Sequence, residues 1–113
     1  MMTLDALTLY GARTAEGLAR CLNNEKFYLQ MVSMALADKN FERLQAAMDA
    51  GDSRAAFEAA HSLKGSIGNV ALTPIYEPIC ALTELLRGRD ALPDGAGALT
   101  AQIMTARQKA LSL

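Results

Sequence analysis

Apolar residues recur at intervals of three and four along nearly the whole chain, and this spacing lines one face of an α-helix. Phe27, Met31 and Met34 form one such run, and Leu99 and Ile103 belong to another. Composition favours the same structure, because the 113 residues include 21 Ala and 17 Leu but only six Val and Ile together. Ala and Leu are strong helix formers, whereas β-branched side chains favour strands. The sequence therefore predicts an all-α fold.

Turn-forming residues divide this pattern into helices joined by short loops. Gly11, Gly51 and Gly88 each follow a helical run, and Pro74 suits the first turn of a helix. Short connections between amphipathic helices favour antiparallel neighbours, so we expect an antiparallel (up-down-up-down) four-helix bundle with an additional short N-terminal helical segment. The expected helices cover residues 3–21 with a break at Gly11, 24–50 as one bent helix or two joined end to end, 53–70, 73–87 and 97–112.

The length of 113 residues fits one domain of ordinary size. We expect a single domain over residues 1–113, with the N-terminal helical segment at 1–22 and the bundle core at 23–112. A chain of this length buries enough surface to fold without a disulfide or a metal. Cys21 and Cys80 lie far apart and form no Cys-x-x-Cys or Cys/His pair, so we expect reduced, partly buried thiols.

The charges nearly balance, with 11 Lys and Arg against 12 Asp and Glu, and both signs are interspersed along the chain. A basic surface of the kind that binds nucleic acid or an acidic membrane is therefore not expected. No apolar stretch reaches the roughly 18 residues that a membrane span requires. The N-terminus lacks the basic and apolar regions of a signal peptide, so we expect a cytoplasmic protein.

His61 is the only histidine, and it lies in the helix expected at 53–70. On a helical wheel, which turns about 100° per residue, the apolar stripe of that helix lies opposite His61. This places His61 toward solvent rather than in the core. The expected core stripe consists of Ala56, Ala59, Leu63, Ile67 and Val70, and the face within about 60° of His61 consists of Arg54, Phe57, Glu58, Lys64, Gly65 and Gly68.

Gly65 and Gly68 lie on the His61 face, four and seven residues after the histidine. Each glycine inside a helix costs about 1 kcal/mol relative to alanine, in a chain that otherwise uses Ala freely. Two such glycines on one face indicate that another molecule approaches the helix backbone closely beside His61. The alternatives are that one glycine simply ends the helix and that His61 is an ordinary surface residue.

An exposed imidazole beside a cation and a cleared backbone suits nucleophilic attack on phosphorus. The unprotonated fraction of a histidine near neutral pH can act as the nucleophile. Phosphoryl transfer depends on positioning and on neutralising charge on the phosphoryl oxygens, which Lys64 can provide one turn along the helix. No second histidine or cysteine accompanies His61 as a metal ligand, and no residue pattern marks a serine or cysteine triad.

Residues 60–70, Ala-His-Ser-Leu-Lys-Gly-Ser-Ile-Gly-Asn-Val, resemble the signature of histidine-containing phosphotransfer (HPt) domains, broadly A-H-x-L-K-G-x-x-x-x-x-G. The resemblance covers residues 24–88 well and the two ends loosely. One departure is Ala71, which stands where many members of the family have a second, closing glycine.

The resemblance implies a four-helix bundle in which His61 accepts a phosphoryl group from an aspartate of one receiver domain and passes it to an aspartate of another. It implies that Lys64 stabilises the phosphoryl group and that Gly65 allows the receiver to dock. The Mg²⁺ needed for the transfer belongs to the receiver in this family, so we expect no cofactor and no metal here. Nothing resembles the ATP-binding domain of a histidine kinase, so we expect a phosphoryl carrier rather than an enzyme.

The docking surface is expected on the His61 face, with Arg54, Phe57, Glu58, Gly65 and Gly68 as its members. Glu58 is also a candidate to accept a hydrogen bond from the imidazole. Thr83 and Arg87, on the next helix, are candidates to face the phosphoryl group. An adjoining helix is expected to add apolar residues, with Met31, Met34 and Ala35 as candidates.

The expected partners are the receiver domains of hybrid histidine kinases and of response regulators. We expect a monomer, because the helices suffice to close a bundle. Two alternatives stay open beside the phosphorelay intermediate. One is a helical adaptor that docks receiver or kinase domains without carrying phosphate, and the other is a small helical enzyme that uses His61 as a general base.

Overall fold

The structure is a computed structural model that describes residues 2–113. Met1, the first residue of the expected N-terminal segment 1–22, lies outside the described residues. Within residues 2–113 all regular structure is helical and no strand occurs, so the all-α prediction is confirmed. The helices are α1 (Leu4–Tyr10), α2 (Thr14–Arg20), α3 (Glu25–Leu36), α4 (Asn40–Asp49), α5 (Ser53–Asn69), α6 (Thr73–Leu86) and α7 (Ala96–Leu111).

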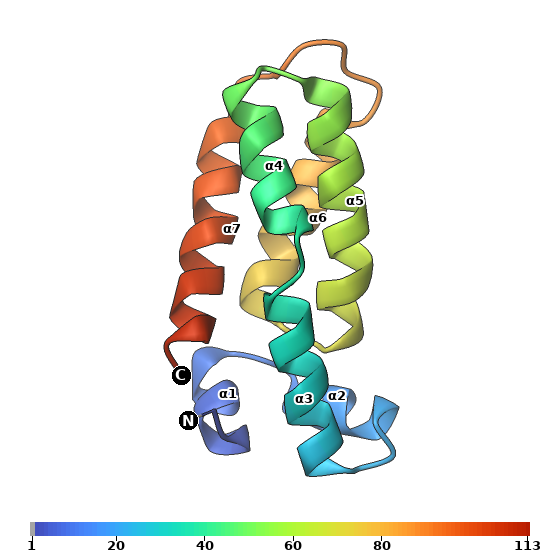
Figure 1. Ribbon diagram of the computed structural model, residues 1–113, viewed down its shortest axis with the longest axis vertical. Helices are drawn as coiled ribbons and strands as arrows, with labels where there is room; N and C mark the ends of the chain where they lie inside the picture. Colours follow the sequence, from blue (N-terminus) through green and yellow to red (C-terminus); the bar gives the residue numbers. More distant parts are fainter. Residues whose placement is uncertain (1) are drawn as a thin grey trace.

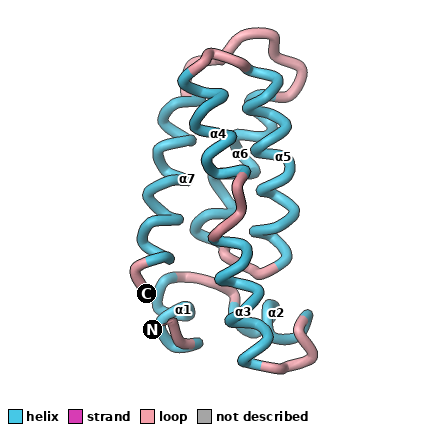
Figure 2. Tube along the Cα trace, in the orientation of Figure 1, coloured by secondary structure: helices cyan, strands magenta, loops and turns pink. Residues whose placement is uncertain are grey.

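Helices α4, α5, α6 and α7 lie side by side along the long axis of the molecule, with their connections at alternating ends (Figure 1). Each packs against the next in the chain, and α4 also packs against α7, which closes the arrangement. Helix α3 continues the line of α4, while α1 and α2 lie at the end where α3 begins. The loop between α6 and α7 lies at the opposite end (Figure 2). The whole therefore forms an elongated body of 42 × 23 × 19 Å.

The core lies between the apolar faces of these helices. All five residues predicted as the core stripe of α5 are buried, which confirms the orientation of that helix. They belong to one continuous cluster with buried residues of the other helices, among them Phe41 and Leu44 of α4, Ile79 and Leu82 of α6 and Ile103 of α7. Because the apolar side of α5 is used for packing, the side that carries His61 is left at the surface.

The segment 24–50 contains two helices rather than one bent helix. Asn24 caps α3 by accepting a hydrogen bond from the backbone N–H of Phe27. Helix α3 ends at Leu36, and Asp38 starts the next one by accepting from the backbone N–H of Asn40 at 2.8 Å. The other carboxylate oxygen of Asp38 accepts from the Ser66 hydroxyl at 2.9 Å, which ties the junction to α5. A side-chain hydrogen bond, rather than Gly or Pro, therefore marks the break.

The N-terminal helices are fastened to the end of α5. The backbone N–H of Arg13 donates to the carbonyl of Ala71 at 3.0 Å, and the Tyr28 hydroxyl donates to the carbonyl of Val70 at 2.9 Å. These bonds satisfy carbonyls that a helix end otherwise leaves unpaired. The position of α2 is thus set by the C-terminal end of the His61 helix.

None of the helices formed by residues 2–113 is long and apolar enough to cross a membrane.

Candidate functional site

His61 lies near the middle of α5 and is exposed, as the sequence predicts. The ring of Phe57, one turn earlier, stacks on the imidazole with 5.8 Å between the ring centroids and 15° between the planes. Phe57 is half-buried, so it is a firmer support than a fully exposed side chain. The guanidinium of Arg87 from α6 lies 5.2 Å from the centre of the Phe57 ring. The imidazole therefore stacks on a ring of its own helix, and that ring in turn meets an arginine of α6.

Charged groups of α5 and α6 influence one another near Phe57, the residue that stacks on His61. Arg87 donates to the Glu84 carboxylate at 3.0 and 3.3 Å. The hydrogen bonds and charge of Arg87 hold the pKa of Glu84 below its ordinary value, and the charge of Lys64 acts in the same direction. Lys64 itself is half-buried and forms no ion pair with any residue of the range 2–113. Its ammonium group is therefore free to meet an incoming anion.

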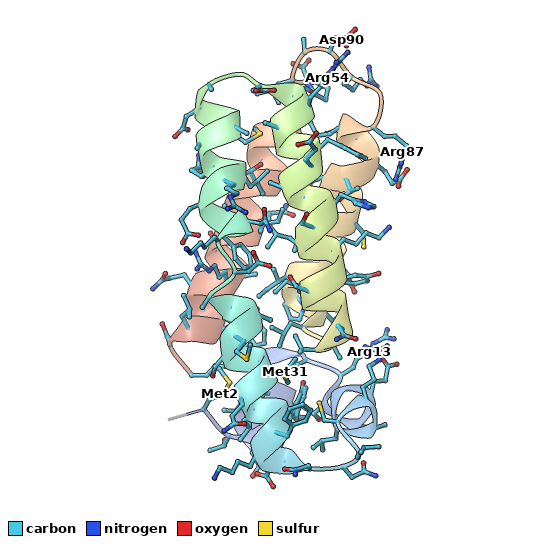
Figure 3. The ribbon with its side chains drawn as sticks, turned by 45° about the vertical axis from the view of Figure 1, so that its right-hand side comes forward. Met2, Arg13, Met31, Arg54, Arg87 and Asp90 are labelled. Atoms are coloured by element: carbon cyan, nitrogen blue, oxygen red, sulfur yellow. The ribbon has the colours of Figure 1, made fainter. Side chains whose placement is uncertain are left out.

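Two predicted members of the His61 face lie at the surface without contacting the imidazole. Glu58 is exposed, and none of the hydrogen bonds formed within residues 2–113 joins it to His61. Arg54 forms an exposed ion pair with Asp90 at 3.4 Å, at the end of α5 near the loop between α6 and α7 (Figure 3). Arg54 lies seven residues before His61, which corresponds to about 10 Å along the helix.

Thr83 is buried and is therefore not exposed to a phosphoryl group at the surface, contrary to the prediction. Its side chain is fully buried, and its hydroxyl donates to the carbonyl of Ile79 in the preceding turn at 2.7 Å. On the same helix Arg87 is exposed, and its guanidinium lies over the ring of Phe57, which stacks on His61. The two residues are four positions apart in α6, yet only Arg87 projects beyond the packing surface.

The candidate apolar residues of α3 differ in exposure. Met34 is 67% exposed and Met31 is half-buried, whereas Ala35 is buried in the core. Met34 and Leu29 of α3 line a surface groove together with Met2, which precedes α1. The lining of this groove contains no residue of the His61 helix, so the structure does not join these methionines to the imidazole.

Gly65 borders open space. A Cβ atom built on Gly65 meets no other atom of residues 2–113 within 4 Å, apart from the backbone of its own helix and its chain neighbours. Packing inside the chain therefore gives no reason for the glycine. The absence of a side chain leaves the backbone of α5 accessible one turn after His61.

Gly68 has an internal explanation. A Cβ atom at this position would lie 2.6 Å from Cε1 of Tyr76, which projects from α6. The glycine thus makes room for the Tyr76 ring rather than for another molecule. Helix α5 continues to Asn69, so neither glycine ends it at its own position.

The turn after α5 contains Ala71, the position at which many members of the family have a glycine. Ala71 adopts the left-handed conformation with φ of +61°, which glycine accepts without strain. The backbone N–H of Ala71 donates to Gly68 and that of Leu72 donates to Ile67, which is the hydrogen-bond pattern of a Schellman turn. The turn geometry is therefore kept with alanine in a conformation that is strained for it.

A groove of about 560 Å³ runs beside Lys64, Gly65 and Gly68. Its other wall is formed by α2, with Arg13 and Arg20, and by Tyr76 and Glu77 of α6. Sequence reasoning missed these residues, because α2 lies far from the motif in the chain and its charges follow no recognisable pattern. Arg20 is anchored there by donating to the carbonyls of Gly68 at 2.8 Å and Asn69 at 3.3 Å.

Among residues 2–113, no three His, Cys, Asp or Glu side chains gather closely enough to hold a metal ion. Cys21 and Cys80 are free thiols, the first buried and the second half-buried.

Comparison with known proteins bears on the same segment. A family model described as Hpt domain matches residues 30–111, which is most of the chain and includes the His61 helix. The search of curated proteins found no match, and the search of solved structures found none. Domains of this family are phosphocarrier modules that interact with receiver domains in two-component phosphorelays. The chain therefore belongs to the Hpt domain family.

Proposed function

We propose that this protein is a histidine phosphotransfer intermediate, in which His61 carries the phosphoryl group between two receiver domains. The observation that carries the proposal is the exposed imidazole of α5, with Lys64 and the open backbone at Gly65 one turn further on. Family membership supports the class of reaction. In this proposal α3 to α7 form the phosphotransfer bundle, and α1 and α2 are the addition to it.

The transfer uses a ring nitrogen of neutral His61. This nitrogen attacks phosphorus of an aspartyl phosphate, a nitrogen–phosphorus bond forms, and the bond from phosphorus to the aspartate oxygen breaks. The aspartate leaves as a carboxylate. Stacking on Phe57 limits the orientations of the imidazole, and Lys64 neutralises charge on the phosphoryl oxygens. The reverse sequence on a second receiver returns the group to an aspartate.

The partners in this proposal are receiver domains of hybrid histidine kinases and response regulators. The Mg²⁺ that supports the reaction comes with the receiver, and in this proposal the protein works as a cytoplasmic monomer. Glu84 and Arg87 flank the reacting group from α6. Arg87 has an exposed guanidinium and is the residue of that helix best placed to approach a phosphoryl group on His61.

The test is transfer of labelled phosphate from a phosphorylated receiver domain to the protein. The wild type is expected to take up the label in a form that is labile to acid and stable to alkali, as a nitrogen–phosphorus bond is. His61→Gln is expected to take up none. Labelling of His61→Gln contradicts the proposal. Binding of the receiver by the wild type without any transfer supports the adaptor alternative instead.

A further inference from the structure

We propose that α2 and its N-cap residue Arg13, which lie outside the segment matched by the family, form a wall of the receiver-docking surface whose two arginines help to select the partner. The inference rests on the proposed function and deepens it. The family match begins at residue 30, whereas α2 ends at Arg20. Yet α2 lines the same groove as Lys64 and Gly65.

The groove lies within reach of any protein that contacts His61. A specific protein interface covers about 800 Å² on each partner, which corresponds to a patch with a radius of about 16 Å. Gly65 and Gly68 follow His61 by about 6 and 10 Å along the axis of α5. A partner centred on the imidazole therefore covers the part of the groove lined by Lys64, Gly65 and Gly68. Arg13 is bonded to Ala71, about 15 Å along the chain axis from His61, and lies at the edge of that patch.

The position of α2 is held firmly. Arg20 donates to the carbonyls of Gly68 and Asn69, and the backbone of Arg13 donates to Ala71. The whole wall is thus attached to the last turn of the helix that carries His61. A partner that docks on His61 therefore meets α2 in one fixed position. Contacts with the side chains of α2 then require no further ordering of the helix.

The charges of the groove suit an anionic partner surface. Three cations and two acids line it, namely Arg13, Arg20, Lys64, Glu16 and Glu77. Glu16 pairs with Arg13 at 3.6 Å, but neither Arg20 nor Lys64 has a carboxylate partner within residues 2–113. In the proposed function the receiver brings an aspartyl phosphate, which is an anion. Charge of this kind steers encounter and selects among partners more than it adds affinity.

The test compares charge reversals at the two edges of the groove. Arg13→Glu removes a cation whose side chain is exposed and makes only one weak ion pair, so the fold is expected to persist. Glu77→Lys adds a cation. The matched control is Lys109→Glu, an exposed reversal on α7, which packs against α6 and α4 rather than along α5.

The measured quantity is the second-order rate of phosphoryl transfer from receiver domains loaded with acetyl phosphate. At about 50 mM salt, Arg13→Glu is expected to lower the rate about tenfold and Glu77→Lys to raise it about threefold. At about 1 M salt both differences are expected to shrink to less than about twofold. The control is expected to stay within about twofold of wild type throughout.

The outcomes separate the two proposals. Wild-type transfer with equal rates for Arg13→Glu, Glu77→Lys and the control overturns the role of α2 alone. Absence of transfer from every receiver overturns the proposed function, and the role of α2 with it. Binding of inorganic phosphate to the groove is measured separately by NMR shifts. If Arg13→Glu abolishes this binding but leaves the transfer rate unchanged, the groove is a small-anion site, and the role of α2 is again overturned.

Discussion

Gly65 and Gly68 are the same residue on the same face of one helix, but their surroundings are opposite. Around Gly65 the surface is open, so the missing side chain leaves the backbone of α5 accessible. Around Gly68 the space is filled by the ring of Tyr76 from α6. One sequence signal therefore has two causes, room for a partner at Gly65 and packing within the chain at Gly68.

The largest expected effect is at Gly65. Gly65→Leu is expected to lower phosphoryl transfer by at least about 100-fold, because displacement of the reacting groups by about 1 Å has effects of this size. The thermal midpoint is expected to stay the same or to rise, since leucine is the better helix former. Gly97→Leu in α7 is the matched control, because Gly97 also faces open space in a helix. Normal phosphoryl transfer by Gly65→Leu contradicts the claim that a partner needs the open backbone at Gly65.

The next effect is on stability at Gly68. Gly68→Ala is expected to lower the free energy of unfolding by about 1 to 2 kcal/mol, because the added methyl group displaces the Tyr76 ring. Gly65→Ala is expected to raise it by up to about 1 kcal/mol. Denaturant unfolding of both variants measures the contrast directly.

A double-mutant cycle identifies the cause at Gly68. In a Tyr76→Ala background the cost of Gly68→Ala is expected to disappear, because the nearest atoms that the added methyl group would meet all belong to the Tyr76 ring. A cost that persists without the tyrosine ring refutes the packing explanation. In that case both glycines belong to the open surface.

A smaller effect is expected at Ala71, just beyond Gly68. Ala71→Gly is expected to raise the free energy of unfolding by about 0.5 to 1 kcal/mol, because the left-handed conformation costs alanine more than glycine. Part of the gain is lost to the greater freedom of glycine in the unfolded chain. Thermal unfolding measures the change, and Ala81→Gly on an exposed position inside α6 is a control expected to be destabilising.

The smallest expected effect is on the pKa of Glu84, which lies near Arg87 and Lys64. The pKa of Glu84 is lowered by Arg87 first and by Lys64 to a lesser degree. A lowered carboxylate pKa contributes stability above the pKa of the unfolded chain, and this is lost as pH falls through the folded value. The contribution is small because both side chains are exposed. In an NMR titration, Arg87→Gln is expected to raise the Glu84 pKa more than Lys64→Gln does. Equal titration in all three proteins contradicts this arrangement.

Much of the site could be predicted because it lies on one helix. The wheel places His61, Lys64 and Gly65 relative to the core without any knowledge of neighbouring helices, and the burial of Leu63 and Ile67 confirms that orientation. The incorrect expectation for Thr83 has a physical reason. Its exposure depends on how α6 is rotated against α5, and a short threonine is easily enclosed in the core with its hydroxyl bonded to its own helix.

The sequence by itself determined the helical class, the exposed histidine and the cation beside it, because helix propensity and helical periodicity are local properties of the chain. Tertiary structure decided what surrounds them. Tyr76 explains Gly68, Phe57 and Arg87 meet beside His61, and α2 forms a wall of the groove at Lys64. Such contacts join residues far apart in the chain, and they depend on the rotation and register of packed helices, which no local pattern specifies.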